Sequence, residues 1–247
     1  MKPSGFDYAA LIVLVAATLF EWLWYWPRCV RAIREHIPGA RGRAYRNIIV
    51  AEWLVALYVL GLWFTKDRPW SALCLGSIAP LRLVAGFLVA AIIVTFLLLQ
   101  GRKVQKMLAQ PKAIARLREK LAFADPLIPE TSGERYGFWL VAITAGICEE
   151  ILFRGFLMWF IAAWTGLAIA VIISSLLFGC AHIYLGAAHV PKTAIVGLLL
   201  ALVVVVSGSL WPAMVIHAAL DLSAGEIGFH VGRAAAAPLE AGEPLTS

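Results

Sequence analysis

Charged residues are scarce in this sequence. Only 15% of its 247 residues are Asp, Glu, Lys or Arg, whereas 62% are hydrophobic, and the mean hydropathy is +0.84. This composition is too apolar for a soluble domain of this length, since such a domain needs a more polar surface. Several apolar runs reach the roughly 20 residues that cross a bilayer. The composition therefore predicts a polytopic membrane protein.

Cysteine motifs and familiar protease signatures are also missing. The four cysteines, Cys29, Cys74, Cys148 and Cys180, are scattered and form no C-x-x-C. Disulfides and a cysteine zinc site are therefore not expected. The sequence has no H-E-x-x-H and no G-x-S-G nucleophile motif. We predict neither a resident metal nor a cofactor.

Basic residues outnumber acidic ones, 21 to 15, which gives a net charge of +6. They gather between apolar runs, in residues 28–46 and 102–120, and do not follow one binding face. The positive-inside rule explains this better than nucleic-acid binding does, and it predicts that both segments are cytoplasmic. Residues 111–121 have helical apolar spacing, typical of either an interfacial amphipathic helix or a solvated connector.

The apolar runs predict an all-α polytopic transmembrane helix bundle of about seven to eight spans. We expect N-terminal spans with basic cytoplasmic loops in residues 1–129 and a disordered tail in residues 226–247, which is small, polar and Pro-containing. The runs that we interpret as helices are residues 8–26, 47–64, 83–99, 137–164, 167–185, 193–206 and 210–222.

The most unusual stretch is CEEILFR, residues 148–154, because it places three charges inside an apolar run. Ionisable groups at membrane depth are costly, and they usually mark a functional site that faces a cavity. On a helix, Glu150 and Arg154 are four residues apart and can pair. Glu149 is rotated away by about 100° and keeps no such partner. Glu149 is therefore the candidate acid or base; a salt-bridged structural helix end is the alternative.

Two later runs carry further polar side chains. FGCAH places His182 four residues after Phe178, and LWPAMVIHAALDL places His217 and Asp221 four residues apart. Together with the carboxylates of the CEEILFR run, these groups can activate a water and stabilise an oxyanion. Glu52 also lies in an apolar run, but we interpret it as an ion-pair partner of the nearby basic loop and leave it out of the site.

These three motifs, in this order, resemble those of the CPBP family of intramembrane proteases. That family includes the Rce-type prenyl-protein Cys-a-a-X endopeptidases and the bacterial Abi proteins. The motifs are EExxxR, FxxxH and HxxxN or HxxxD, and they stand here as EEILFR, FGCAH and HAALD. The resemblance implies a catalytic core in residues 130–225, with a conical active-site cavity between spans four to seven.

The resemblance also implies roles for individual residues. Glu149 and His182 would activate water, and His217 and Asp221 would stabilise the oxyanion. Glu150 and Arg154 would support the site together with Phe178. One departure is that Asp221 stands where the prenyl-protease branch has Asn, and an ionised Asp cannot donate a hydrogen bond. Asp221 is thus either protonated, or it accepts a hydrogen bond that orients His217.

The resemblance further implies a peptide bond near the C-terminus of a membrane-associated protein or peptide as the substrate, with or without a prenyl group. The enzyme would lie in a bacterial inner membrane, in contact with the lipid bilayer, with its site open to the cytoplasmic side. Three alternatives remain: a zinc protease that uses the same four catalytic groups as ligands, a cysteine mechanism at Cys148 or Cys180, and a non-proteolytic membrane immunity or scaffold protein.

Overall fold

A computed structural model describes residues 2–76, 79–121 and 126–236, and within these ranges the chain forms helices and no strand. This confirms the predicted all-α class. The helices are α1 (Gly5–Phe20), η1 (Glu21–Tyr25), α2 (Trp26–Arg34), α3 (Ala40–Thr65), η2 (Trp70–Leu73), α4 (Pro80–Met107), α5 (Pro111–Leu121), α6 (Ser132–Glu149), η4 (Glu150–Leu157), α7 (Met158–Thr165), α8 (Leu167–Ala181), η5 (Ile183–Leu185), η6 (Ala187–His189), α9 (Val190–Ser207) and α10 (Leu210–Ala236).

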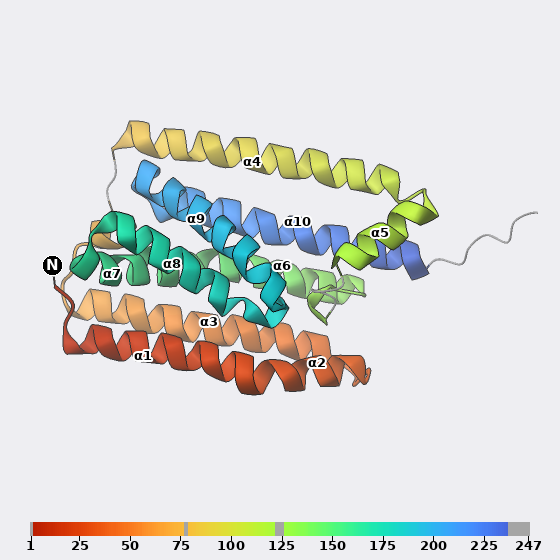
Figure 1. The fold of residues 1–247 in the computed structure, drawn as a ribbon, viewed down its shortest axis with the longest axis horizontal. Helices are drawn as coiled ribbons and strands as arrows, with labels where there is room; N and C mark the ends of the chain where they lie inside the picture. Colours follow the sequence, from red (N-terminus) through yellow and green to blue (C-terminus); the bar gives the residue numbers. More distant parts are fainter. Residues whose placement is uncertain (1, 77–78, 122–125, 237–247) are drawn as a thin grey trace, which may run out of the picture.

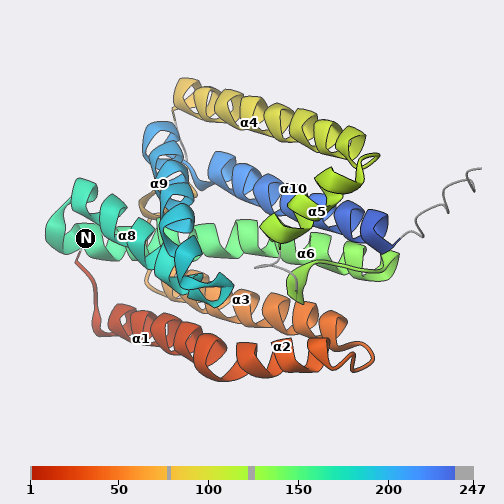
Figure 2. The same ribbon diagram turned by 45° about the vertical axis from the view of Figure 1, so that its right-hand side comes forward.

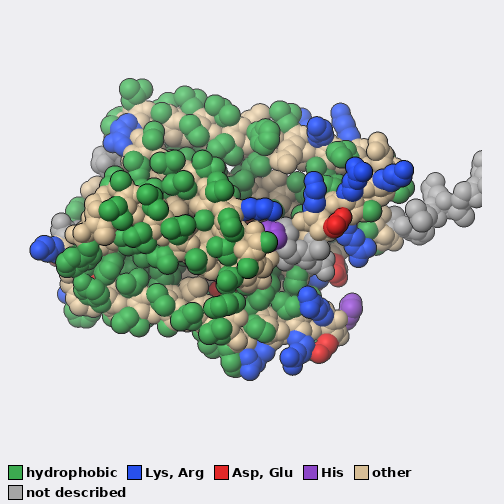
Figure 3. All heavy atoms as spheres, in the orientation of Figure 1, with side chains coloured by type: hydrophobic (Ala, Val, Ile, Leu, Met, Phe, Trp, Pro, Cys, Tyr) green, Lys and Arg blue, Asp and Glu red, His purple; other side chains and the backbone are tan. Residues whose placement is uncertain are grey.

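Among the described residues, four helical stretches are long and apolar enough to cross a membrane: Gly5–Arg34, Ala40–Thr65, Pro80–Met107 and Ala187–Ser207. The first of these runs through α1, η1 and α2 as one continuous helix. Apolar side chains cover most of the face in Figure 3, whereas Lys and Arg gather toward one end of the molecule. The predicted total of seven to eight spans stays a prediction.

The long helices lie side by side, with α4 on one flank and α1 to α3 on the other (Figures 1 and 2). Between them, α6 packs against both α3 and α10, and α10 also packs against α4. On another side, α8 packs against both α9 and η4. The helix that carries the CEEILFR motif is therefore the centre of the bundle, and motif residues from other helices can reach it.

Local sequence explains where the central helices begin and end. Thr131 is the N-cap of α6, and its hydroxyl accepts a hydrogen bond of 3.2 Å from the backbone N–H of Glu134. At the end of α9, Gly208 takes a left-handed φ of +72°, which favours glycine. The guanidinium of Arg82 donates to the carbonyls of Val205 and Val206, so the last turn of α9 is satisfied.

A glycine allows α6 and α10 to approach closely. A Cβ added at Gly146 would lie 2.8 Å from both the backbone nitrogen and the Cβ of Ala218. Only a residue without a side chain fits there, as at other close crossings of membrane helices. Gly146 precedes the CEEILFR motif, and Ala218 follows His217. This contact therefore brings two of the three motifs together.

The structure differs from the expected disordered tail over residues 226–236, which continue α10 as helix. This extension is fastened to α6, since the carboxylate of Glu226 accepts hydrogen bonds of 2.7 Å from Arg135 and from Nε1 of Trp139. A small residue of this segment serves close packing, because a Cβ at Gly228 would lie only 2.9 Å from the side chain of Ile128. The rest of the expected tail, residues 237–247, lies outside the described residues.

Candidate active site

The predicted pair of Glu150 and Arg154 forms at the start of a π-helical segment, η4. Nη1 of Arg154 donates a hydrogen bond of 2.8 Å to Oε1 of Glu150, and both side chains are fully buried. Nη2 of Arg154 also donates to the carbonyl of Gly197 on α9, at 3.1 Å. A buried guanidinium needs such partners, because an unpaired charge in an apolar interior is very costly. π-helical turns of this kind are frequent at functional sites.

Glu150 has a second partner that the sequence did not suggest. Its Oε1 atom also lies 2.8 Å from Nδ1 of His217 on α10. A carboxylate paired with Arg154 can only accept, so Nδ1 of His217 carries the proton and donates. One oxygen of Glu150 therefore accepts hydrogen bonds from both Arg154 and His217, so it pairs with the guanidinium and fixes the orientation of the imidazole ring. This fixed ring directs the other nitrogen of His217, Nε2, toward Glu149.

Glu149 lies beside both histidines. Its Oε2 atom is 3.7 Å from Nε2 of His182 and 3.8 Å from Nε2 of His217. Oε2 is buried and has no hydrogen-bond partner within the described part of the chain. These separations exceed direct hydrogen bonds, and they leave the three atoms around a common space into which a small polar group can donate and accept.

The orientation of His182 follows from the end of α8. Nδ1 of His182 lies 2.8 Å from the backbone carbonyl oxygen of Phe178. Since a carbonyl only accepts, Nδ1 is the donor, and this assignment leaves Nε2 of the neutral ring as an acceptor that faces Glu149. The interval of four residues in FGCAH thus sets the tautomer of the histidine.

The ring of Phe178 contacts three polar side chains of the site. Its centroid lies 4.6 Å from that of His182 and 5.7 Å from that of His217, and the guanidinium carbon of Arg154 lies 4.0 Å above it. The ring is fully buried, and Phe153 packs against it edge to face. Phe178 therefore restrains the two imidazoles by packing, and it adds a cation–π contact to Arg154.

Asp221 is near His217 but does not orient it. Oδ2 of Asp221 lies 3.7 Å from Nε2 of His217, beyond hydrogen-bond range, whereas Nδ1 of His217 is held by Glu150. The side chain of Asp221 is 40% exposed and lines the same cavity as Glu149 and His182. Of the two roles left open for Asp221, its position favours a direct role in the cavity over the orienting role.

The cavity has a volume of about 570 Å³ and reaches beyond the helices that carry the three motifs. Its wall includes residues of α1, η1, α2 and α3 as well as of α6 and α10. The expected cavity between spans four to seven is therefore wrong in its extent, because the N-terminal helices close one side of it. Of these helices, α3 packs against α6 and η4, and α1 and α2 pack against α3. The N-terminal helices therefore form part of the site.

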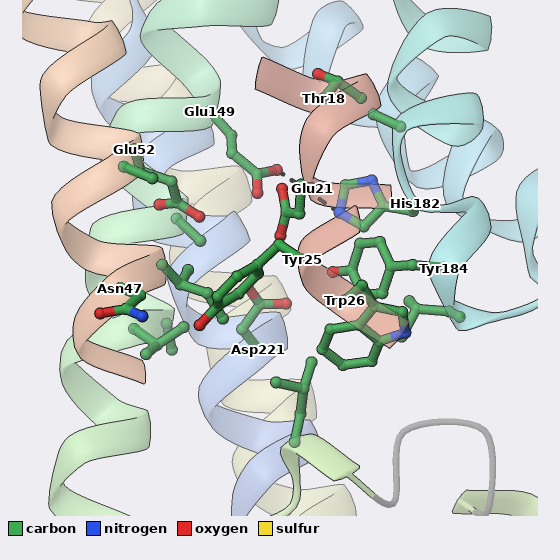
Figure 4. Close-up of a pocket in the computed structure, with 18 of the residues that line it drawn as sticks. Thr18, Glu21, Tyr25, Trp26, Asn47, Glu52, Glu149, His182, Tyr184 and Asp221 are labelled. Carbon is green, nitrogen blue, oxygen red and sulfur yellow. Dashed lines mark ion pairs between the residues drawn. The ribbon is translucent and has the colours of Figure 1, made fainter. Parts of the chain in front are cut away.

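Two acidic residues of the cavity were not included in the predicted site. Figure 4 shows Glu21 from η1 and Glu52 from α3 on the same cavity as Glu149, His182 and Asp221. The interpretation of Glu52 as an ion-pair partner of the basic loop is wrong, because its charged neighbours are the carboxylates Glu149, Glu21 and Asp221. Both residues are charged side chains inside apolar runs. The same pattern identified Glu149, so it could also have identified Glu21 and Glu52 as candidates.

The structure also shows where the groups for a metal-dependent or a cysteine mechanism lie. Within the described ranges, no group of three or more His, Cys, Asp or Glu side chains has the arrangement of a metal site. The thiol of Cys148 belongs to a fully buried residue, and Cys180 is exposed but is absent from the cavity wall. A cysteine nucleophile in this cavity therefore has no support from the geometry.

The fold and the site define a class: an all-α protein of long apolar helices with a carboxylate and imidazole cluster inside the bundle. Residues 131–223 match the family described as type II CAAX prenyl endopeptidase, Rce1-like. This match supports the predicted family over that part of the chain. It supports a CAAX-type intramembrane protease function, and with the apolar helices it supports an integral membrane protein that acts on a membrane-associated protein substrate. No curated protein and no solved structure matches the chain.

Proposed function

We propose that this protein is an intramembrane glutamic endopeptidase that cleaves a peptide bond near the C-terminus of a membrane-associated substrate. The observation that carries the proposal is the meeting of Oε2 of Glu149 with Nε2 of His182 and Nε2 of His217 at 3.7 and 3.8 Å. A water in contact with these atoms has two acceptors, the carboxylate and the neutral His182, that can draw off its proton.

The reaction follows from these positions. Water attacks the scissile carbonyl carbon while Glu149 takes one of its protons, and His182 holds the water through Nε2. The carbonyl oxygen gains negative charge and receives a hydrogen bond from Nε2–H of a doubly protonated His217, whose Nδ1–H stays on Glu150. The C–N bond then breaks, and Glu149 returns its proton to the leaving amine. Asp221 adds a second donor to this oxygen if its carboxyl group is protonated.

The substrate and the cell compartment belong to the same proposal. The family match supports a Cys-a-a-X substrate, and the apolar cavity wall suits a substrate that approaches from the bilayer. We propose that the basic loops lie on the cytoplasmic side of a bacterial inner membrane, so that the site opens toward the cytoplasm. The N-terminal helices in residues 1–129 would complete the cavity of the core in residues 130–225.

The test uses purified protein in liposomes with a quenched fluorescent Cys-a-a-X peptide, farnesylated or with a free cysteine. Mass spectrometry of the products identifies the cleaved bond. We expect cleavage of the farnesylated peptide, and cleavage of both peptides would remove the prenyl requirement. Activity that a chelator abolishes and zinc alone restores would favour a zinc protease. Folded protein that cleaves neither peptide would favour the immunity or scaffold role.

A further inference from the structure

The cavity is strongly biased toward negative charge. Its wall carries the carboxylates of Glu21, Glu52, Glu149 and Asp221, and no Lys or Arg is among its lining residues in the described chain. The proposed hydrolysis uses Glu149 and Asp221 but not Glu21 or Glu52. Two further carboxylates in a mostly apolar wall are costly without a compensating charge, so they need an explanation of their own.

Glu52 in particular lacks a partner. Its Oε2 atom is buried and accepts no hydrogen bond from any part of the chain that the structure describes. The charges that act on it are those of Glu149, Glu21 and Asp221, all of the same sign. A carboxylate in this setting gains most from a cation that enters the cavity from outside.

Aromatic rings line the same part of the cavity. Tyr25, Trp26 and Tyr184 stand beside Glu21 in Figure 4, and the rings of Trp26 and Tyr184 pack with their centroids 4.9 Å apart. Aromatic faces attract ammonium and guanidinium groups, and they also pack against the apolar stem of Lys or Arg. Carboxylates beside aromatic rings are thus suited to a cationic side chain more than to a purely apolar one.

The backbone places Glu21 at this point. The first long helix changes from α to π geometry over Glu21–Tyr25, and the first and last residues of this π-helical segment both line the cavity. A π-helical turn changes the direction of the side chains relative to a regular helix, and such turns are common at functional sites. The second π-helical segment of the described chain, η4, follows Glu149 directly. Both irregular segments therefore border the cavity.

We propose that Glu21 and Glu52 form an acidic subsite that binds a Lys or Arg side chain of the substrate, close to the bond that is cleaved. This inference rests on the proposed peptidase function and names the substrate class that the cavity selects. The ammonium or guanidinium group lies between the two carboxylates, and its stem packs against Trp26 and Tyr184. The acidic subsite determines specificity and takes no part in the chemical step.

The experiment compares farnesylated Cys-a-a-X peptides that carry one Lys, or one Nε-acetyl-lysine at the same place, scanned through the positions around the scissile bond. Acetylation removes the charge and keeps the stem. We expect kcat/KM to favour Lys by about tenfold or more at one position, the ratio that one desolvated ion pair or cation–π contact supplies. Glu52→Gln and Glu21→Gln should each reduce this ratio, while the exposed Glu119→Gln on α5 keeps it.

Peptide binding separates this proposal from the proposed hydrolysis. Fluorescence anisotropy measures the affinity of the same peptides for Glu149→Ala protein, with and without Glu52→Gln. Tighter binding of the Lys peptide that Glu52→Gln abolishes supports the acidic subsite, even if the wild type cleaves nothing. Equal affinities and equal cleavage of Lys and acetyl-lysine peptides at every position would overturn it and leave the peptidase function intact. If Glu52→Gln does not fold, Glu21→Gln gives the same comparison.

Discussion

Glu150 holds His217 across the interface of two helices: Oε1 of Glu150 lies 2.8 Å from Nδ1 of His217 and equally close to Nη1 of Arg154. One carboxylate oxygen thus joins all three motif regions, because Arg154 also lies against the ring of Phe178. In this arrangement Glu150 is a positioning residue. It neutralises Arg154 and keeps Nε2 of His217 directed at Glu149.

Removing the Glu150 carboxylate should destabilise the protein strongly. Glu150→Ala leaves a fully buried guanidinium unpaired, and the expected loss is about 3–5 kcal/mol of folding free energy. The measurement is thermal unfolding in detergent, followed by fluorescence. The double variant Glu150→Gln, Arg154→Met removes both charges and should recover part of the stability. An unchanged melting temperature in Glu150→Ala would contradict the assigned pairing.

The close crossing of α6 and α10 gives a second prediction. Gly146→Ala forces a methyl group against the backbone of Ala218, at a cost of about 1–3 kcal/mol, and separates Glu149 from His217. We expect a lower melting temperature together with lower kcat. Gly101→Ala is the matched control, because a Cβ there meets nothing within 4 Å. The prediction is wrong if the two variants behave alike.

The loop that precedes α6 predicts a weak pH dependence. The hydrogen bond from Arg41 lowers the pKa of Glu130 below its ordinary value of 4.5. A carboxyl with a lower pKa in the folded state stabilises that state above about pH 4.5, and this contribution disappears as pH falls through the folded pKa. The Glu130 side chain is 69% exposed, so the effect should stay below about 1 kcal/mol.

The measurement for Glu130 is the difference in melting temperature between wild type and Glu130→Gln. We expect a small difference near pH 6 that shrinks as pH falls below 4.5. A difference that does not change with pH would show that the charge of Glu130 is irrelevant to stability.

The cysteines should be dispensable for catalysis. Cys148 is buried away from the cavity and Cys180 does not line it, so neither thiol can reach a substrate carbonyl there. The double variant Cys148→Ala, Cys180→Ala should retain at least about half of the wild-type kcat/KM, since small apolar residues replace each other at little cost. A loss as large as that of a Glu149 variant would revive the cysteine mechanism.

The chemistry of the site was more predictable than its boundary. Short-range spacing was enough for the pair of Glu150 and Arg154, because a helix brings residues four apart together. The contact of His217 with Glu150 depends on how α6 and α10 cross, and the sequence contains no direct sign of that crossing apart from Gly146. Glu52 was misassigned because its nearest charges along the chain are basic, whereas the fold turns it toward other carboxylates.

The composition of the C-terminal segment also misled the expectation. Small, polar and Pro-containing segments are typical of disordered tails, yet residues 226–236 continue α10, and Gly228 lies close to Ile128 in the loop before α6. Composition describes what a segment can bury alone. Composition gives no information on whether a neighbouring helix packs against the segment.

The role of Glu149 as the base that activates water is tested by the cleavage rate of Glu149→Gln in liposomes, beside wild type and the surface control Glu119→Gln. Glutamine keeps the shape of residue 149 but cannot take a proton from water. If Glu149 is the base, kcat falls by about 10² or more in Glu149→Gln while its melting temperature stays at the wild-type value, and Glu119→Gln keeps full activity. Cleavage by Glu149→Gln at the wild-type rate would show that Glu149 is not the base.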